Sequence, residues 1–178
     1  MIKYILIFMT TINFNQEPNV IFKFDKTSNI DSWKVINDVV MGGKSLGKFF
    51  LSTDGNGVFE GDVSIENNGG FSSIRLNTNG IKTNSYKTIS LRLKGDGSVF
   101  QFRIKGSKYE RHSYIYNFQT TGDYETIEIP LQEMKPSYRG YRLDISNFNQ
   151  EKIEQIGFLK ASKKNIHFRL EIEHIYLN

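Results

Sequence analysis

The chain has 178 residues, no cysteine and a formal net charge of +4. This length fits one domain built around a single core. The absence of cysteine excludes disulfides, thiolate nucleophiles and cysteine-ligated metal sites. The 23 Lys and Arg residues are scattered among 19 carboxylates rather than gathered on one segment, so no nucleic-acid partner is expected.

Residues 1–18 are expected to form an N-terminal segment ahead of a single domain at 19–178. Lys3 and the apolar run Tyr4–Met9 resemble the start of a secretory signal, but no small-x-small cleavage site precedes Asn15. The run is too short to span a bilayer, so no transmembrane segment is expected. A frayed or strand-forming segment and a cytoplasmic location are favoured, with export as the alternative.

From Val20 onward, apolar and polar side chains alternate, and turn signals recur every eight to twelve residues or so. Segments with this pattern are 20–24, 46–51, 58–65, 72–76, 89–94, 99–105, 112–119, 124–129, 156–159 and 168–177. The 14 Phe and 9 Tyr residues also favour strands. The sequence therefore predicts an all-β fold, an antiparallel two-sheet β-sandwich of jelly-roll type.

Two segments within this pattern lack a clear strand period. Residues 131–143, which contain Pro136, Arg139 and Gly140, are expected to form a surface loop. Residues 149–155 are expected to hold one helical turn.

Two pairs of adjacent glycines, Gly42-Gly43 and Gly69-Gly70, interrupt the alternation. Each pair follows amide or carboxylate side chains and precedes a β-forming segment, which is typical of a tight backbone corner. Gly70 stands directly before Phe71, which predicts a positive φ or close backbone packing at Gly70. Asp38, Asn67 and Asn68 are expected to cap exposed backbone groups in these corners, with ligand binding as the alternative.

The two corners belong to a longer ordered set of residues. The set comprises Trp33, Asp38, Met41, Gly42, Gly43, Ser45, Asn68, Gly69, Gly70, Phe71, Gly95, Asp96, Gly97, Arg139 and Gly140. In this order and spacing the chain resembles the CIA30 family, the complex I intermediate-associated protein 30 domain. The resemblance implies a galactose-binding-like β-sandwich and, from the mitochondrial members, a non-catalytic assembly-factor or chaperone-like role with a protein partner.

Known catalytic and metal-binding patterns find no match, so no catalytic residue, metal site or cofactor is expected. Gly42-Gly43-Lys44-Ser45 ends like a phosphate-binding loop, but Asp38 stands where that loop needs its first glycine. Glu60 and Asp62 share one strand face with the carboxylates about 6 to 7 Å apart, which suits an inverting glycosidase but is also typical of a solvated strand.

The histidines and one acidic turn are further candidates for metal binding. The three histidines lack ligand spacing, and His174 alternates with Ile172 and Tyr176, which predicts a core position. The turn Asp54-Gly55-Asn56 leaves structural calcium open, although it does not match an EF-hand loop.

Binding is the function that remains. Tyr114, Tyr116 and Phe118 share one strand face, with Arg103 and Arg111 near in sequence. They could form an aromatic and guanidinium platform for a protein or a sugar ring; the alternative is that this face fills the core. Arg139 is a candidate interface anchor because loops on rigid sandwiches often carry function. A protein-binding, assembly-factor-like module is the leading hypothesis, a carbohydrate-binding module is the alternative, and a glycoside hydrolase is third.

Overall fold

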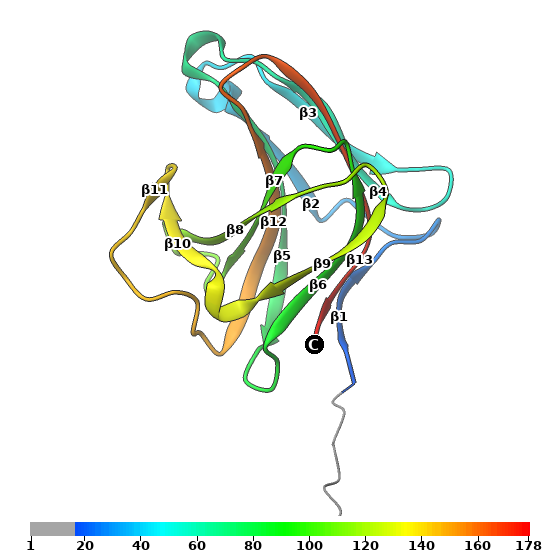
Figure 1. The fold of residues 1–178 in the computed structure, drawn as a ribbon, viewed down its shortest axis with the longest axis vertical. Helices are drawn as coiled ribbons and strands as arrows, with labels where there is room; N and C mark the ends of the chain where they lie inside the picture. The colour runs from blue at the N-terminus through cyan, green and yellow to red at the C-terminus, as the bar shows by residue number, and fades with distance from the viewer. Residues whose placement is uncertain (1–16) are drawn as a thin grey trace, which may run out of the picture.

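The computed structural model describes residues 17–178, which form two antiparallel sheets packed face to face (Figure 1). The expectations for the first 16 residues lie outside this range. The first sheet has the order β3-β4-β13-β6-β9, with β1 also paired to β13. The second has the order β11-β10-β8-β7-β12-β5-β2. The prediction of an all-β sandwich is confirmed.

The first sheet contains β1 (Asn19–Lys23), β3 (Leu46–Leu51), β4 (Gly57–Val63), β6 (Thr88–Gly95), β9 (Tyr124–Pro130) and β13 (Ile166–Leu177). The second contains β2 (Trp33–Asn37), β5 (Phe71–Lys82), β7 (Val99–Lys105), β8 (Ser113–Gln119), β10 (Lys135–Tyr138), β11 (Tyr141–Arg142) and β12 (Lys152–Ala161). Three short 3-10 turns are η1 (Asp38–Met41), η2 (Glu66–Asn68) and η3 (Leu131–Glu133). No helix in residues 17–178 has the length and apolar character needed to cross a bilayer.

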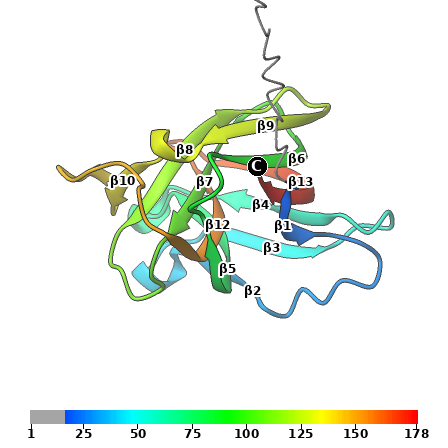
Figure 2. The ribbon, with the colours of Figure 1, turned by 90° about the horizontal axis from the view of Figure 1, so that it is seen from below.

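The core lies between the sheets and is filled by the apolar members of each alternating strand. Phe102 of β7 and Phe158 of β12 meet edge to face with ring centroids 5.1 Å apart. Phe59 and Phe168 make a similar contact in the other sheet at 4.7 Å. Figure 2 shows the sandwich from below, with β12 and β5 to the left of β13 and β1. Because side chains alternate along a regular strand, the neighbours of a core residue there point to the outer face.

Two expectations about the connecting segments are wrong. The region expected to be a loop at 131–143 contains η3 and the β10–β11 hairpin. Arg139 and Gly140 form its turn with φ values of 50° and 83°, the signs of a type I′ turn. The helical turn expected at 149–155 is absent, since β12 begins at Lys152 and pairs with β5 on one side and β7 on the other. The pairing of β12 with a strand on each side outweighed the weak local preference for a helical turn.

The core position expected for His174 is also wrong. The register of β13 against β6 shifts between Ile172 and His174, so Ile175 rather than His174 turns into the core. His174 is half-buried and packs against Tyr176, with ring centroids 4.4 Å apart. A bulge of this kind reverses the alternation beyond it, which a period-two reading of the sequence cannot detect.

The carboxylate of Asp38 joins the two double-glycine corners. Asp38 is fully buried and accepts four hydrogen bonds: from Ser45 N at 2.9 Å, Ser45 Oγ at 2.5 Å, Gly70 N at 2.7 Å and Phe71 N at 3.1 Å. A Cβ on Gly43 would lie 2.3 Å from Asp38 Oδ1, and one on Gly69 would lie 2.7 Å from Oδ2. Glycine is therefore needed in both corners because the carboxylate occupies the space of a side chain.

Neighbouring polar groups extend this connection. Asn37 Oδ1 accepts hydrogen bonds from Gly47 N at 3.0 Å and Ser72 Oγ at 2.6 Å, so it links β2, β3 and β5. Asn67 and Asn68 both have φ near 60°, a conformation that asparagine tolerates better than most residues. Asn67 Nδ2 donates to Gly42 O at 3.1 Å, which ties the second corner to the first.

Asp38 is expected to make stability depend on acid. Burial raises its pKa, but the hydrogen bonds from Ser45, Gly70 and Phe71 outweigh burial and hold the pKa below its ordinary value. A lowered pKa stabilises the fold above the unfolded-state value of about 3.9, and this contribution is lost as the pH falls through the folded-state pKa. Asp38→Asn should lose about 2 to 3 kcal/mol at pH 7 and show a flatter decline below about pH 4 in urea unfolding. Exposed Asp54→Asn is the control, and equal curves for both variants would contradict the role of Asp38.

Gly70→Ala is expected to destabilise the second corner. Gly70 has φ of 132°, and an added Cβ would lie 3.0 Å from Ser162 O. The change should cost about 1 to 3 kcal/mol in thermal unfolding. Gly122→Ala is the control, because Gly122 has φ of 97° but open space around its Cα. If both variants lose the same stability, the corner contributes only ordinary backbone strain.

Candidate functional site

The outer face of the seven-stranded sheet carries a row of basic side chains. Residues directly opposite each other in antiparallel strands point to the same side of the sheet. Following this register across six strands gives one row: Lys34, Arg75, Gly157, Arg103, Ile115 and Lys135. The row holds four cations and no carboxylate.

The rows on either side of this basic row are neutral or positive. One runs through Ile36, Ser73, Leu159, Gln101 and Asn117, and the other through Asn77, Gln155 and Lys105. The amides pair with each other across strands: Gln101 Nε2 donates to Asn117 Oδ1 at 2.9 Å and Gln155 Nε2 to Asn77 Oδ1 at 2.8 Å. The middle of this face is therefore positive and contains no group that could neutralise it.

Arg75 and Arg103 lie on either side of Gly157 and are half-buried. Within residues 17–178 no carboxylate comes within 4.0 Å of either guanidinium. The Nε of Arg103 is buried and has no hydrogen-bond partner among the described residues. Burial, followed by the charge of Arg75, lowers the pKa of Arg103 to about 10, so Arg103 remains charged at neutral pH. Burial also lowers the pKa of Arg75.

Gly157 keeps the space between the arginines open. A Cβ at this position would lie 2.5 Å from Ile74 O and 3.3 Å from Arg75 Cγ, so β5 and β12 approach too closely for a side chain. The result is a small hollow of about 10 Å³. Its polar lining comes from Ser73, Arg75, Arg103, Lys105, Ser113 and Gln155.

The acidic residue Glu110 lies next to Lys105 at the border of this hollow. Lys105 Nζ donates to the backbone carbonyl of Glu110 at 2.6 Å. Burial and the charges of Arg75 and Arg103 lower the pKa of Lys105, while Glu110 opposes them. The Glu110 carboxylate itself accepts from Gln150 Nε2 at 2.8 Å, and its Oε2 is 4.0 Å from His112 Nε2. The Glu110 carboxylate therefore has Gln150 as its hydrogen-bond donor, and its Oε2 has no hydrogen-bond partner among the described residues.

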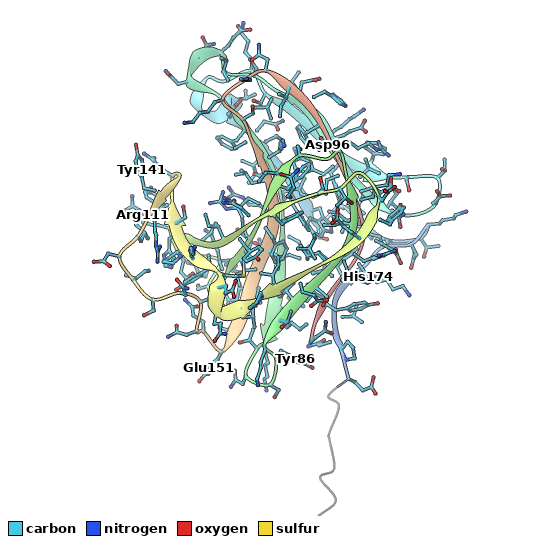
Figure 3. The ribbon with its side chains drawn as sticks, in the orientation of Figure 1. Tyr86, Asp96, Arg111, Tyr141, Glu151 and His174 are labelled. Carbon is cyan, nitrogen blue, oxygen red and sulfur yellow. The ribbon has the colours of Figure 1, made fainter. Side chains whose placement is uncertain are left out.

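A second group of binding-type side chains lies at the β10–β11 hairpin. The Tyr138 ring has the guanidinium carbon of Arg111 at 5.2 Å and that of Arg139 at 5.5 Å from its centroid. Arg111 Nη2 also donates to Tyr138 Oη at 3.1 Å, and this bond, followed by nearby positive charge, lowers the pKa of Tyr138. Figure 3 shows Arg111 and Tyr141 together on the hairpin side of the molecule, and Tyr141 is 78% exposed.

The tyrosines and Arg103, which the sequence suggested as parts of one platform, lie on opposite faces of the sheet. Tyr114 is 5% exposed and packs against Phe148, with ring centroids 5.2 Å apart. Tyr116 is half-buried and also packs on the core. Arg103 stands on the opposite face of the sheet because it pairs with Ile115, between the two tyrosines. Arg111 and Arg139 do come together, through Tyr138.

Sequence reasoning missed Arg75, Lys105 and Gly157. The signal for the two cations was available, since they are the polar members of alternating segments whose apolar members were assigned to the core. What was missing was the strand order, which places β5 and β7 on either side of β12. The role of Gly157 can be recognised only when β5 and β7 are known to be its neighbouring strands.

The carboxylates considered for glycoside hydrolysis are engaged in ion pairs. Glu60 bonds Lys48 Nζ at 2.9 Å and also Arg169, and these contacts lower its pKa despite partial burial. Asp62 lies 3.0 Å from His167 Nδ1 on the exposed surface. Over residues 17–178, no group of three or more His, Asp or Glu side chains is placed to hold a metal ion. Asn56 of the turn considered for calcium donates instead to Tyr124 Oη and Glu171.

Comparison with known families gives a match over residues 22–172, to the family described as complex I intermediate-associated protein 30 (CIA30). The chain belongs to this family. The membership inferred from the two double-glycine corners is therefore confirmed, and the Asp38 connection lies within the matched region.

One curated relative is a mitochondrial protein. The chain is 30% identical over 124 residues to "Altered inheritance of mitochondria protein 23, mitochondrial" from Vanderwaltozyma polyspora. The match covers 67% of this chain but only 30% of that protein's length. The relative does not support a cytoplasmic location in particular.

Solved structures with a similar fold are carbohydrate-binding modules. The family 11 module of the Clostridium thermocellum cellulase Lic26A-Cel5E has a TM-score of 0.67 at 16% identity, covering 90% of this chain and 94% of that one. A family 11 module from the same organism, in complex with a β-1,3-1,4-mixed-linked tetrasaccharide, has a TM-score of 0.64 at 19% identity, covering 87% and 94%. A family 29 module from Piromyces equi has a TM-score of 0.55 at 10% identity, covering 90% and 89%. At these identities the likeness concerns the fold alone.

Tyr114→Ala is expected to destabilise the domain rather than a binding surface. Removing a ring buried against Phe148 should cost about 3 to 5 kcal/mol in chemical unfolding. Tyr141→Ala is the matched control and should change stability by less than about 0.5 kcal/mol because its ring is exposed. A small loss for Tyr114→Ala would contradict its assignment to the core.

Proposed function

We propose that this CIA30-family domain is a non-catalytic, assembly-factor-like binding module that holds a protein partner through its β10–β11 hairpin. The observation that carries the proposal is the cluster of Tyr138, Arg139 and exposed Tyr141 in the β10–β11 hairpin with Arg111 of the β7–β8 connection. Arginine and tyrosine are the residue types most enriched among interface hot spots.

The construction of the hairpin supports this role. A two-residue turn at Arg139-Gly140 fixes the direction of both strands, and β10 pairs with β8 in the sheet. Arg111 and Arg139 are held against the Tyr138 ring, which lowers the entropy lost when they bind a partner. The hairpin therefore offers a preorganised surface on a rigid scaffold.

The comparisons support the kind of partner. The family is named for association with a complex I intermediate, and the curated relative is named as mitochondrial. On this basis we propose a chaperone-like role in the assembly of a mitochondrial protein complex, with complex I intermediates as the first partners to test.

Carbohydrate binding is the second candidate, because a module of the same fold is described in complex with a tetrasaccharide. A sugar-binding surface usually presents a row of aromatic rings to stack on the sugars. In the three outward rows described above, cations, amides and aliphatic residues take those places, and the aromatic row of β8 faces inward. The protein partner is therefore the better-supported proposal.

Arg139→Asn is expected to weaken partner binding without unfolding the domain. Asn-Gly is a favoured pair for a type I′ turn, so the melting temperature should stay the same or rise slightly. Loss of an interface arginine should reduce affinity by about 2 to 4 kcal/mol. The measurement is recovery of complex I intermediates from a mitochondrial extract on the immobilised full chain, by quantitative mass spectrometry.

Arg92→Gln is the matched control, since it removes one arginine from β6 in the other sheet. Equal recovery by Arg139→Asn and wild type would contradict the hairpin as the site. An empty pull-down combined with binding on a glycan array would replace the protein partner with a carbohydrate.

A further inference from the structure

We infer that the hollow between Arg75 and Arg103 binds one oxyanion group, a carboxylate or a phosphate. This site is separate from the β10–β11 hairpin and does not depend on the proposed assembly role. Three observations carry it: two half-buried arginines without a carboxylate partner, a buried donor with no acceptor, and a glycine that keeps the space between them open.

The first observation concerns charge. Buried or half-buried cations in folded proteins are normally paired, because removal from water disfavours an isolated charge. On the other sheet, outward arginines are paired: Arg169 with Glu60 and Glu171, and Arg92 with Glu173. Arg75 and Arg103 face each other across one strand with no such group among the described residues. An anion between them would relieve both the desolvation and the mutual repulsion.

The second observation concerns hydrogen bonding. A buried N–H without an acceptor is rare in native structures and calls for an explanation. Arg103 Nε is such a group, and Arg103 lines the hollow together with Arg75 and Lys105. A guanidinium donates through Nε and a terminal nitrogen together to the two oxygens of a carboxylate or phosphate. The unused Nε of Arg103 is therefore suited to this two-bond contact.

The third observation concerns size and surroundings. Adjacent strands are about 4.8 Å apart, so β5 and β7 lie about 10 Å apart across β12. The hollow of about 10 Å³ admits one water-sized atom. One oxygen of the ligand therefore enters the hollow, and the rest of the oxyanion stays at its mouth between the two arginines. Gln155 and Ser113 add neutral polar atoms, and no acidic residue among residues 17–178 lines the hollow. The Glu110 carboxylate, outside this lining, accepts from Gln150. The site fits a single oxyanion rather than a sugar ring.

The test uses the full chain at pH 7 with inorganic phosphate and with a hexaglutamate peptide, each compared with sodium chloride at equal ionic strength. Saturating phosphate or peptide should raise the wild-type melting temperature by about 2 to 4 °C above the chloride control. In amide NMR spectra, Gly157, Arg75 and Arg103 should shift in a saturable way. A hexaglutamine peptide controls for peptide contacts without charge, and the tighter ligand shows whether the natural source is a phosphate or an acidic side chain.

Arg103→Gln and Arg75→Gln should each reduce the affinity at least tenfold while the chain remains folded, since each removes an unpaired cation. Arg92→Gln is the matched control and should bind like wild type. Equal effects of chloride and phosphate, or unchanged titrations in Arg103→Gln, would overturn the inference. If a variant fails to fold, the wild-type spectra still decide, because saturable shifts that map away from Gly157 would also overturn it.

The two proposals can fail separately. Loss of recovery in Arg139→Asn with normal phosphate binding would leave both standing. Normal protein recovery without any saturable oxyanion effect would remove only the hollow as a site. Oxyanion binding with an empty pull-down would remove only the assembly role.

Discussion

The buried carboxylate of Asp38 is the interaction on which the upper end of the sandwich depends. It accepts hydrogen bonds from two separate corners, one after β2 and one before β5, and so fixes how β2, β3 and β5 meet. The glycines at 43 and 69 follow from this arrangement, because the carboxylate fills the space that side chains would need. Residues that look like a ligand-binding motif in the sequence are engaged in holding the backbone.

The Asp38 connection is linked to the outer face through β5. The strand starts at Phe71, whose N–H bonds Asp38, and its register then places Ser72, Ile74 and Leu76 inward and Ser73 and Arg75 outward. A slip of one residue would turn Arg75 into the core and Ile74 into water. The same interaction that closes the corner therefore sets the position of Arg75 against Gly157 and Arg103. The bond from Phe71 to Asp38 thus contributes to stability at the start of β5 and also fixes where Arg75 lies at its centre.

The outer faces of the two sheets differ in whether their charged side chains are paired. On the six-stranded sheet, Glu60, Arg169 and Glu171 alternate in sign across β4 and β13 and form a network. On the seven-stranded sheet, the central cations have only neutral amides and aliphatic groups beside them. Uncompensated charge in a half-buried row lowers stability, and groups of this kind concentrate at binding sites. In this chain the ion pairs of the six-stranded sheet neutralise its outer face, whereas the central cations of the seven-stranded sheet have no carboxylate partner among the described residues.

The sequence by itself determined the fold class, the family, most strands and most of the core, because alternation and glycine pairs are local signals. Phe100, Phe102 and Ile104 had to face inward together, and Gly70 had to leave the ordinary backbone region. Tertiary structure alone decided the bulge that turns His174 out of the core, the hairpin at Arg139, and the row that joins Arg75 to Arg103. These features depend on which strands are neighbours and in what register, and pairing between strands distant in sequence leaves no periodic trace within either one.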